Sequence, residues 1–456
     1  MRGEGSTKTP AQRLLEALGP VDGLHSDDPE IGDFGSPARI NTEDFLAPRQ
    51  QGSELSRLGP LEKVHVFWLA GMSCDGCTVS VVGAETPSIE SLLLNAHPGL
   101  PRVVLHHPAV NIESGPHYVR AHEQALTGQL DAPYVIVAEG SMTEETRALQ
   151  TGGYWVSQGE QPWGPDGALR AVTTDEWIAR LAPGAAASIA IGTCATWGGI
   201  PSADGNPTGA MSLMDFLGKD YRSTFGVPVV NVPGCAPVGD NFMETVAAIL
   251  YFLQGFGPLP EFDSLGRPAW LFGETVHRHC VRGAYYEEGS FAKEFGDHEC
   301  LVEIGCWGPV VNCNIASRGA IRHVGGCMNA GGACIGCTMP GFPDKFTPFY
   351  KAPPGGKVSS NTSRAVGRVM RPLREYSNSH LNRETRWDLH GEVPTAWARE
   401  KTEPGRVQEA GHRLYDVLRR AGDRGKDRGD EWGKRAEWTL EKDPATERRL
   451  PGGEDA

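Results

Sequence analysis

The sequence predicts an α/β protein that begins with a parallel sheet covered by helices on both faces. Two observations predict this fold. Short apolar segments ending in Gly, Cys or Glu alternate with helix-like segments between residues 61 and 264. After about residue 265 the alternation fades, and glycines, aromatics and cysteines dominate. Because such a segment cannot bury a large apolar core, we expect metal bonds to supply much of its folding free energy.

Five apolar segments are predicted to be buried strands: residues 61–71, 101–107, 132–140, 186–194 and 226–235. The helix-like stretches are residues 88–96, 144–150, 173–182 and 241–254. Residues 1–60 are expected to be a polar N-terminal arm with one short helix near Arg13–Leu18. In parallel α/β sheets the functional site lies beyond the carboxyl ends of the strands. We therefore expect the residues that follow these strands to meet at one edge.

Composition limits the classes of function. The 456 residues carry a formal net charge of −14, which disfavours nucleic acid as a partner. No long uninterrupted apolar run is present, so no membrane span is expected. The N-terminus lacks a hydrophobic export core, which predicts a cytoplasmic protein that touches a membrane, if at all, through a partner. Flavin or nicotinamide binding is not expected, because no phosphate-binding glycine motif follows a strand.

All eleven cysteines lie between Cys74 and Cys337. Thiolates and imidazoles are ligands for zinc ions and for iron–sulfur clusters. With His277, three residues before Cys280, the chain offers enough soft ligands for three four-ligand centres. The pattern therefore predicts a series of iron–sulfur clusters that carries electrons.

Disulfides and structural zinc are the alternatives. An odd number of cysteines in a chain without an export signal argues against disulfides. Zinc sites usually combine two close cysteine pairs, whereas Cys77, Cys194 and Cys235 are far apart in sequence. The pair Cys74 and Cys77, then Cys194, then Cys235 follow three different predicted strands. The sequence therefore predicts a first cluster at the carboxyl edge of the sheet.

Two further ligand sets lie downstream of the sheet. The first is His277, Cys280, Cys300 and Cys306. His279 is the rival imidazole, and spacing favours His277. A neutral imidazole lowers the negative charge of a cluster, which makes this set a plausible electron exit. The second set is Cys313, Cys327, Cys334 and Cys337. Cys327 is either the fourth ligand of a four-iron cluster or a free buried thiol beside a three-iron cluster.

Several motifs in this order resemble those of the small subunit of NiFe hydrogenases. They are WLAGMSCDGC (68–77), GTCATWGG (192–199), VPGC (232–235), TVHRHC (275–280), AYYEEGSFAKEFGDHEC (284–300), CWGPVVNC (306–313) and CIGCTMPGFPD (334–344). The resemblance covers roughly residues 62–350. It implies a flavodoxin-like domain over 61–264, an irregular iron–sulfur domain over 265–350, and a NiFe site on a separate large subunit.

The resemblance also implies a place for each cluster. Cys74, Cys77, Cys194 and Cys235 would hold the proximal cluster, nearest the active site. His277, Cys280, Cys300 and Cys306 would hold the distal cluster. Cys313, Cys334 and Cys337 would hold the medial one. We expect three 4Fe–4S clusters, with a 3Fe–4S medial cluster if Cys327 is not a ligand.

The proximal motif departs from familiar members of the family. The two additional cysteines of oxygen-tolerant, membrane-bound members are absent, and Asp75 lies inside the ligand loop. The resemblance to actinobacterial-type high-affinity enzymes, whose proximal cluster has three cysteines and an aspartate, makes Asp75 a candidate ligand. The alternative is that Asp75 caps the following helix. The export signal and C-terminal membrane helix of the family are also missing, which favours a cytoplasmic form.

Two regions bear on the partner subunit. Glu139 ends a strand on the same side as the proximal cysteines. It has two possible roles. One is a role at the partner, by contacting it or by helping protons leave, and the other is to make structural hydrogen bonds. Residues 351–456 contain no cysteine and are rich in charge. We expect this extension to wrap the partner, with short helices at 386–390 and 406–422. The alternative is a solvated tail.

The predicted function is electron transfer in an uptake hydrogenase, with hydrogen oxidised on the large subunit. Electrons would pass through the three clusters to an acceptor protein or a quinone-linked carrier, and we expect a dimer of heterodimers or a larger assembly. A hydrogen-sensing regulatory subunit is one alternative. A single-cluster quinone-reductase-type or formate-linked subunit is the other, although such relatives lack the seven downstream cysteines.

Overall fold

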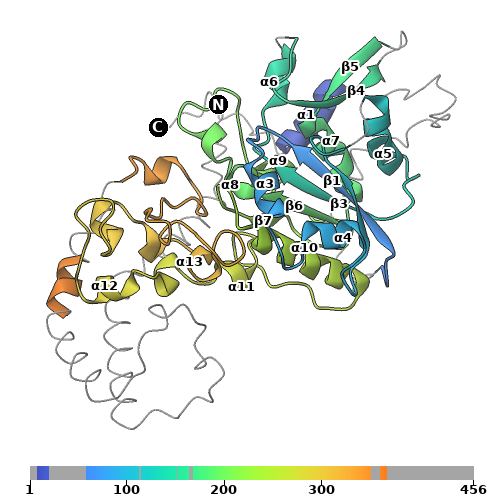
Figure 1. The fold of residues 1–456 in the computed structure, drawn as a ribbon. Helices are drawn as coiled ribbons and strands as arrows, with labels where there is room; N and C mark the ends of the chain where they lie inside the picture. Colours follow the sequence, from blue (N-terminus) through green and yellow to red (C-terminus); the bar gives the residue numbers. More distant parts are fainter. Residues whose placement is uncertain are drawn as a thin grey trace.

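The computed structural model describes residues 8–19, 58–111, 115–150, 152–163, 168–350 and 360–366. Figure 1 shows two parts, a sheet domain and a smaller irregular domain packed beside it. The predicted helices at 386–390 and 406–422 lie outside the described residues. Among the described helices, none is both long and apolar enough to cross a membrane.

The sheet domain contains five parallel strands, as the sequence predicts. They are β1 (Lys63–Ala70), β2 (Arg102–His106), β3 (Tyr134–Glu139), β6 (Ala187–Ile191) and β7 (Val230–Val232). Their spatial order is β2-β1-β3-β6-β7. This is the flavodoxin-like order, in which the chain reverses direction between its first and third strands. Ligands of such sheets bind outside the carboxyl ends, and that edge carries the cysteine loops described below.

Helices cover both faces of the sheet (Figure 1). They are α1 (Pro10–Leu18), α3 (Gly76–Val82), α4 (Ile89–Leu93), α5 (Pro116–Leu126), α6 (Glu145–Gln150), α7 (Thr174–Leu181), α8 (Gly192–Trp197), α9 (Leu213–Leu217) and α10 (Gly239–Gln254), with 3-10 turns η1 (Ala182–Gly184) and η2 (Ile200–Ser202). Alternate residues of β1 enter different cores. Val66 and Trp68 pack against α4 and α10, whereas Phe67 and Leu69 pack against α1, α7 and α9.

A two-stranded antiparallel hairpin was not predicted. It consists of β4 (Ser157–Trp163) and β5 (Ala168–Thr173). Its buried positions include Gln158, whose amide binds the backbone of β1 by donating to Trp68 O and accepting from Ala70 N. Burial of glutamine in place of an apolar side chain removes the alternation by which strands are found in a sequence. The helices α5, α8 and α9 were also missed, whereas α3 was expected only in the interpretation that Asp75 caps the helix after it.

The second domain has little regular structure. Its elements are α11 (Ala269–Phe272), η3 (Val276–His279), α12 (Gly283–Glu287), η4 (Leu301–Ile304), η5 (Gly308–Val310), α13 (Ile315–Arg318) and η6 (Asp344–Phe346). A further short helix occupies residues 360–366. Cys306 and Cys334 belong to its apolar core together with Trp307 and Phe342. Leu271 still packs in the core of the sheet domain, so the change from one core to the other occurs just after α11.

Side chains from α10 join the two domains. Asn241 exchanges two side-chain hydrogen bonds with Asn314, at 2.7 and 2.9 Å. Further along α10, Glu244 forms a two-pronged ion pair with Arg318. These contacts hold the second domain at the carboxyl edge of the sheet.

Candidate metal centres

Four cysteines converge at the carboxyl edge of the sheet, as the strand ends predict. Cys74 follows β1, Cys77 lies in the first turn of α3, Cys194 lies in α8 directly after β6, and Cys235 follows β7. Burial, and then the charge of Cys235, raises the pKa of the Cys194 thiol to about 11. Burial also raises the pKa of Cys77, with contributions from Glu139 and the three other thiols. Each sulfur therefore lies within electrostatic reach of the others.

Two glycines leave room for these sulfurs. A Cβ atom at Gly192 would lie 2.3 Å from the Sγ of Cys77, and one at Gly199 would lie 2.8 Å from the Sγ of Cys194. Both glycines have positive backbone φ angles, +82° and +55°, which residues with a side chain rarely adopt. The local backbone thus keeps side-chain atoms out of the space around the thiols, where an inorganic group would fit.

The carboxyl-edge group opens to the surface. Cys74 and Cys235 are exposed, whereas Cys77 and Cys194 are partly buried. By contrast, Cys300, Cys306 and Cys334 in the second domain are buried. One end of the thiol series is therefore accessible to a partner.

Asp75 does not cap α3. It occupies the N-cap position with a left-handed backbone (φ 59°), but its side chain makes no capping hydrogen bond. Its own N–H donates to the Oγ of Ser73 at 3.0 Å. The helix-cap alternative is therefore wrong. The exposed carboxylate lies between Cys74 and Cys77 in the chain, so it remains a candidate ligand.

Glu139 performs the capping instead. Its Oε1 accepts the backbone N–H groups of Cys77 (3.2 Å) and Thr78 (3.3 Å) in the first turn of α3. Its other oxygen accepts Trp68 Nε1–H at 2.8 Å and the hydroxyl of Thr78. His107 Nε2 lies 2.9 Å from that hydroxyl. Glu139 has no exposed area, so in this chain it makes the structural hydrogen bonds that were one of its two predicted roles.

The second group lies in the irregular domain. His277, Cys280, Cys300 and Cys306 line one pocket together with Arg282 and Met328. Burial, and then the thiols of Cys306 and Cys280, raise the pKa of Cys300 to about 12. The rival His279 is exposed and pairs with Glu274 outside this pocket. The structure therefore brings together the four residues that spacing favours.

The third group consists of Cys313, Cys327, Cys334 and Cys337. Burial, and then the charge of Cys327, raises the pKa of Cys313 to about 11. Burial also raises the pKa of Cys337, with contributions from Cys313 and Cys327. Cys327 therefore lies near Cys313 and Cys337, and its charge also raises the pKa of Cys306 in the second group.

The third group lies between the other two. On one side, Cys235 of the carboxyl-edge group lies close enough to affect the pKa of Cys337. On the other side, the N–H of Cys334 donates to the Sγ of Cys306 at 3.4 Å. Thr193 links the first and third groups, because its hydroxyl donates to the carbonyl of Cys337 and accepts the N–H of Gly234 at 3.0 Å. The three groups therefore form a row.

The donor geometry distinguishes one ion from a cluster. Ligands of a single zinc ion converge within about 2.0–2.3 Å of it. Within the described ranges, no three His, Cys, Asp or Glu side chains are arranged tightly enough to hold one metal ion. A four-iron cluster is larger and holds its thiolates further apart, so three loose groups of four soft donors fit clusters better than zinc.

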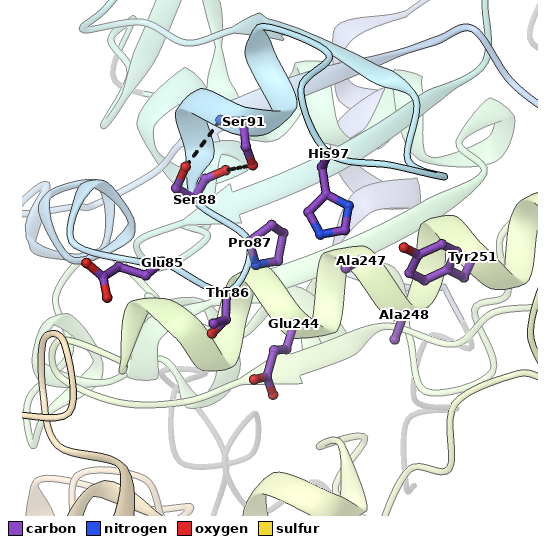
Figure 2. A pocket seen from close by; sticks show the side chains of 10 residues that line it. All are labelled: Glu85, Thr86, Pro87, Ser88, Ser91, His97, Glu244, Ala247, Ala248 and Tyr251. Carbon is purple, nitrogen blue, oxygen red and sulfur yellow. Dashed lines mark hydrogen bonds between the residues drawn. The ribbon is translucent and has the colours of Figure 1, made fainter.

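A separate pocket of about 570 Å³ lies between α10 and the segment that leads into α4 (Figure 2). It is lined by Glu85, Thr86, Pro87, Ser88, Ser91, His97, Glu244, Ala247, Ala248 and Tyr251. Its two carboxylates, Glu85 and Glu244, are already paired with Arg322 and Arg318. Because none of its lining residues is a cysteine, this pocket is distinct from the row of thiols.

Comparisons with known proteins address the same segments. Residues 272–350 match the C-terminal family of the NiFe/NiFeSe hydrogenase small subunit. Residues 74–249 match the family described as NADH ubiquinone oxidoreductase, 20 Kd subunit.

Individual relatives match over most of their lengths. The chain is 34% identical to the periplasmic NiFeSe hydrogenase small subunit of Desulfomicrobium baculatum, over 64% of this chain and 88% of the relative. It is 31% identical to the hydrogenase-2 small chain of Escherichia coli K12, over 68% and 80%. Among solved structures, the actinobacterial-type NiFe-hydrogenase from Ralstonia eutropha H16 matches with 46% identity and a TM-score of 0.67, over 74% of this chain and 96% of that one.

Proposed function

Because this chain belongs to the family of NiFe hydrogenase small subunits, we propose that it is the electron-transfer subunit of an uptake hydrogenase. Members of this family pair with a large subunit that carries the NiFe site, so hydrogen is activated outside this chain. The observation that carries the proposal is the row of three soft-donor groups. It begins at the exposed edge of the sheet and continues through the second domain, where Cys300, Cys306 and Cys334 are buried.

Each group would hold one iron–sulfur cluster. Cys74, Cys77, Cys194 and Cys235 would hold the proximal one. Cys313, Cys327, Cys334 and Cys337 would hold the medial one. His277, Cys280, Cys300 and Cys306 would hold the distal one. When bound, such clusters supply one-electron oxidation and reduction. The chain's own residues would place the three groups in a row and bury Cys300, Cys306 and Cys334 in the second domain.

The proposed cluster type is 4Fe–4S at all three positions. The position of Cys327 among the medial thiols supports a four-iron medial cluster. Asp75 is the proposed alternative ligand at the proximal position, in place of one thiolate of Cys74 or Cys77. The absence of a capping bond from its carboxylate supports this role, because it leaves the oxygen atoms free to bind metal.

The large subunit is proposed to dock on the exposed proximal edge. Beside Cys74, α3 exposes Val79 (69%) and Val82, and the neighbouring loop exposes Ile321 and Val324 (71%). Exposed apolar patches of this kind mark protein–protein interfaces. Docking here would place the partner's active site next to the proximal cluster.

Electrons are proposed to leave at the distal end, to an acceptor protein or a quinone-linked carrier. We further propose a cytoplasmic enzyme, assembled as a dimer of heterodimers or a larger particle, with residues 351–456 wrapping the large subunit. Two donor groups in the second domain favour this function over a single-cluster, quinone-reductase-type subunit. A hydrogen-sensing subunit is the remaining alternative, and rapid hydrogen-dependent dye reduction by the purified complex would exclude it.

The decisive experiment is iron and sulfide counting on the anaerobically purified complex, combined with electron paramagnetic resonance. About twelve irons on the small subunit would support three cubane clusters, and about eleven would indicate a three-iron medial cluster. About four would overturn the three-cluster layout. Changing Asp75 to Ala should alter the proximal signal if its carboxylate is a ligand, whereas an unchanged spectrum would remove it from the ligand set.

A further inference from the structure

Two arginines lie against the two donor groups of the second domain, and their charges are compensated differently. Arg282 lines the pocket of the distal group, and its backbone N–H donates to the Sγ of Cys280 at 3.4 Å. Its guanidinium donates to the main-chain carbonyl oxygens of Asp297 (2.6 Å) and Glu299 (2.8 Å). Carbonyl oxygens are neutral acceptors. Among the described residues, no carboxylate forms an ion pair with Arg282, so its positive charge is retained.

Arg267 lies beside the medial group and is only 5% exposed. Its Nη1 lies 3.8 Å from the Sδ of Met339, two residues after Cys337, and its charge favours the thiolate of Cys313. Unlike Arg282, it donates to a carboxylate, since its Nε is 2.8 Å from the Oδ2 of Asp263. The other oxygen of Asp263 accepts two backbone N–H groups, which fixes the pair in place.

We propose that Arg267 and Arg282 set the difference in reduction potential between the medial and distal centres, with Asp263 cancelling the charge of Arg267 while Arg282 remains uncompensated. The inference rests on the proposed function, because it needs clusters at both sites. Reduction adds one negative charge to a cluster, so a nearby cation favours the reduced form.

The direction of electron flow follows from this arrangement. Each electron that passes from the medial to the distal position oxidises the first by one electron and reduces the second by one. Arg282 stabilises that added electron with a full charge. Arg267 and Asp263 act on the medial position as a dipole, whose field falls off faster than that of a single charge. The two residues therefore favour movement toward the distal end of the row.

The test measures midpoint potentials of the assembled complex by redox titration with electron paramagnetic resonance. Arg282→Gln keeps a donor for the carbonyls of Asp297 and Glu299 but removes the charge. We expect the distal potential to fall, reducing the equilibrium constant for medial-to-distal transfer about tenfold, which equals about 59 mV for a one-electron couple. Arg282→Lys keeps the charge and should stay near the wild-type potential. A distal potential unchanged in Arg282→Gln would overturn the proposal.

The medial pair gives an independent test with changes that remove one charge each, of which Asp263→Asn is nearly isosteric. Asp263→Asn removes the negative charge that compensates Arg267, so the reduction potential of the medial centre should rise. Arg267→Gln should lower it, and the double variant should lie close to the wild type. An unchanged medial potential in Asp263→Asn would contradict the role of the pair, even if Arg282→Gln lost its cluster.

Iron and sulfide content shows whether a negative result contradicts the proposed function or only the role of the arginines. A wild-type complex without three clusters on the small subunit would contradict the proposed function. Full iron content with unshifted potentials in the charge variants would contradict only the role of the arginines.

Discussion

The two domains differ in what forms their interiors. In the sheet domain, alternate side chains of β1 fill two continuous apolar cores, and β3 is buried along its whole length. In the second domain, the described helices between 269 and 350 have at most five residues, and Cys306 and Cys334 occupy the core beside Trp307. The first domain is therefore stabilised by apolar burial. For the second, we expect bonds from its thiols to metal to supply much of the stability.

Removal of iron should test this difference most severely. Structural metal sites can contribute on the order of 10 kcal/mol to folding. After anaerobic chelation, hydrogen exchange should become fast across residues 276–346, while the amides of β1, β3 and β6 stay protected. Slow exchange throughout the second domain of the iron-free protein would show that it does not depend on metal.

A cavity in the sheet core should destabilise the sheet domain and leave the second domain intact. Ile136 on β3 is fully buried, and its replacement by Ala should cost about 2–5 kcal/mol. Native-state hydrogen exchange of the sheet amides measures this loss, and the iron content should stay unchanged. Leu94→Ala, at an exposed position, is the control and should have little effect. Loss of iron in Ile136→Ala would show that the two domains do not fold independently.

Acidification should weaken the sheet domain through His122. Burial, and then the neighbouring His106, lowers the pKa of this histidine to about 3. Below an unfolded pKa of about 6.5 the unfolded chain binds a proton that the folded chain excludes, so stability falls as pH drops toward 3. Replacement of His122 by Phe should flatten the pH dependence of thermal unfolding between pH 6 and 4, as followed by circular dichroism. An identical slope in the variant would contradict the assignment.

Glu139→Gln should weaken the hydrogen bonds that join the sheet to the first turn of α3, which carries Cys77. The amide keeps one acceptor oxygen but presents an N–H₂ group to donors, so at least one of four hydrogen bonds is lost, at about 1–3 kcal/mol. We expect a changed proximal signal in electron paramagnetic resonance. Glu123→Gln is the matched control, because that buried carboxyl accepts only from Gln161 in the described contacts and lies away from the cysteines. Equal effects from both variants would argue against a specific role for Glu139.

The smallest effect is expected at the N-terminal helix. Arg13 of α1 pairs with Glu144 at 3.2 Å, at a partly exposed position. Arg13→Ala should cost less than about 1 kcal/mol, as measured by thermal unfolding of the complex. A larger loss would mean that α1 contributes more to the sheet domain than its surface ion pair indicates.

The sequence predicted the parts of the fold that depend on local pattern. Apolar runs located all five parallel strands, and their ends located Cys194 and Cys235 at one edge. The hairpin was missed because Gln158 is buried through hydrogen bonds to β1, which no periodicity reveals. Asp75 was open to misassignment as a cap because the actual cap, Glu139, is 62 residues away from Cys77. Hydrogen bonds between residues so far apart in the sequence can be identified only in the folded structure.

The hydroxyl of Thr193 bridges loops that belong to different domains, the loop of Gly234 and that of Cys337. The separation between the first two relay positions is thus a property of the domain joint rather than of either domain. Together with the hydrogen bonds between Asn241 and Asn314 and the ion pair between Glu244 and Arg318, this hydroxyl fixes the distance between the first and third thiol groups.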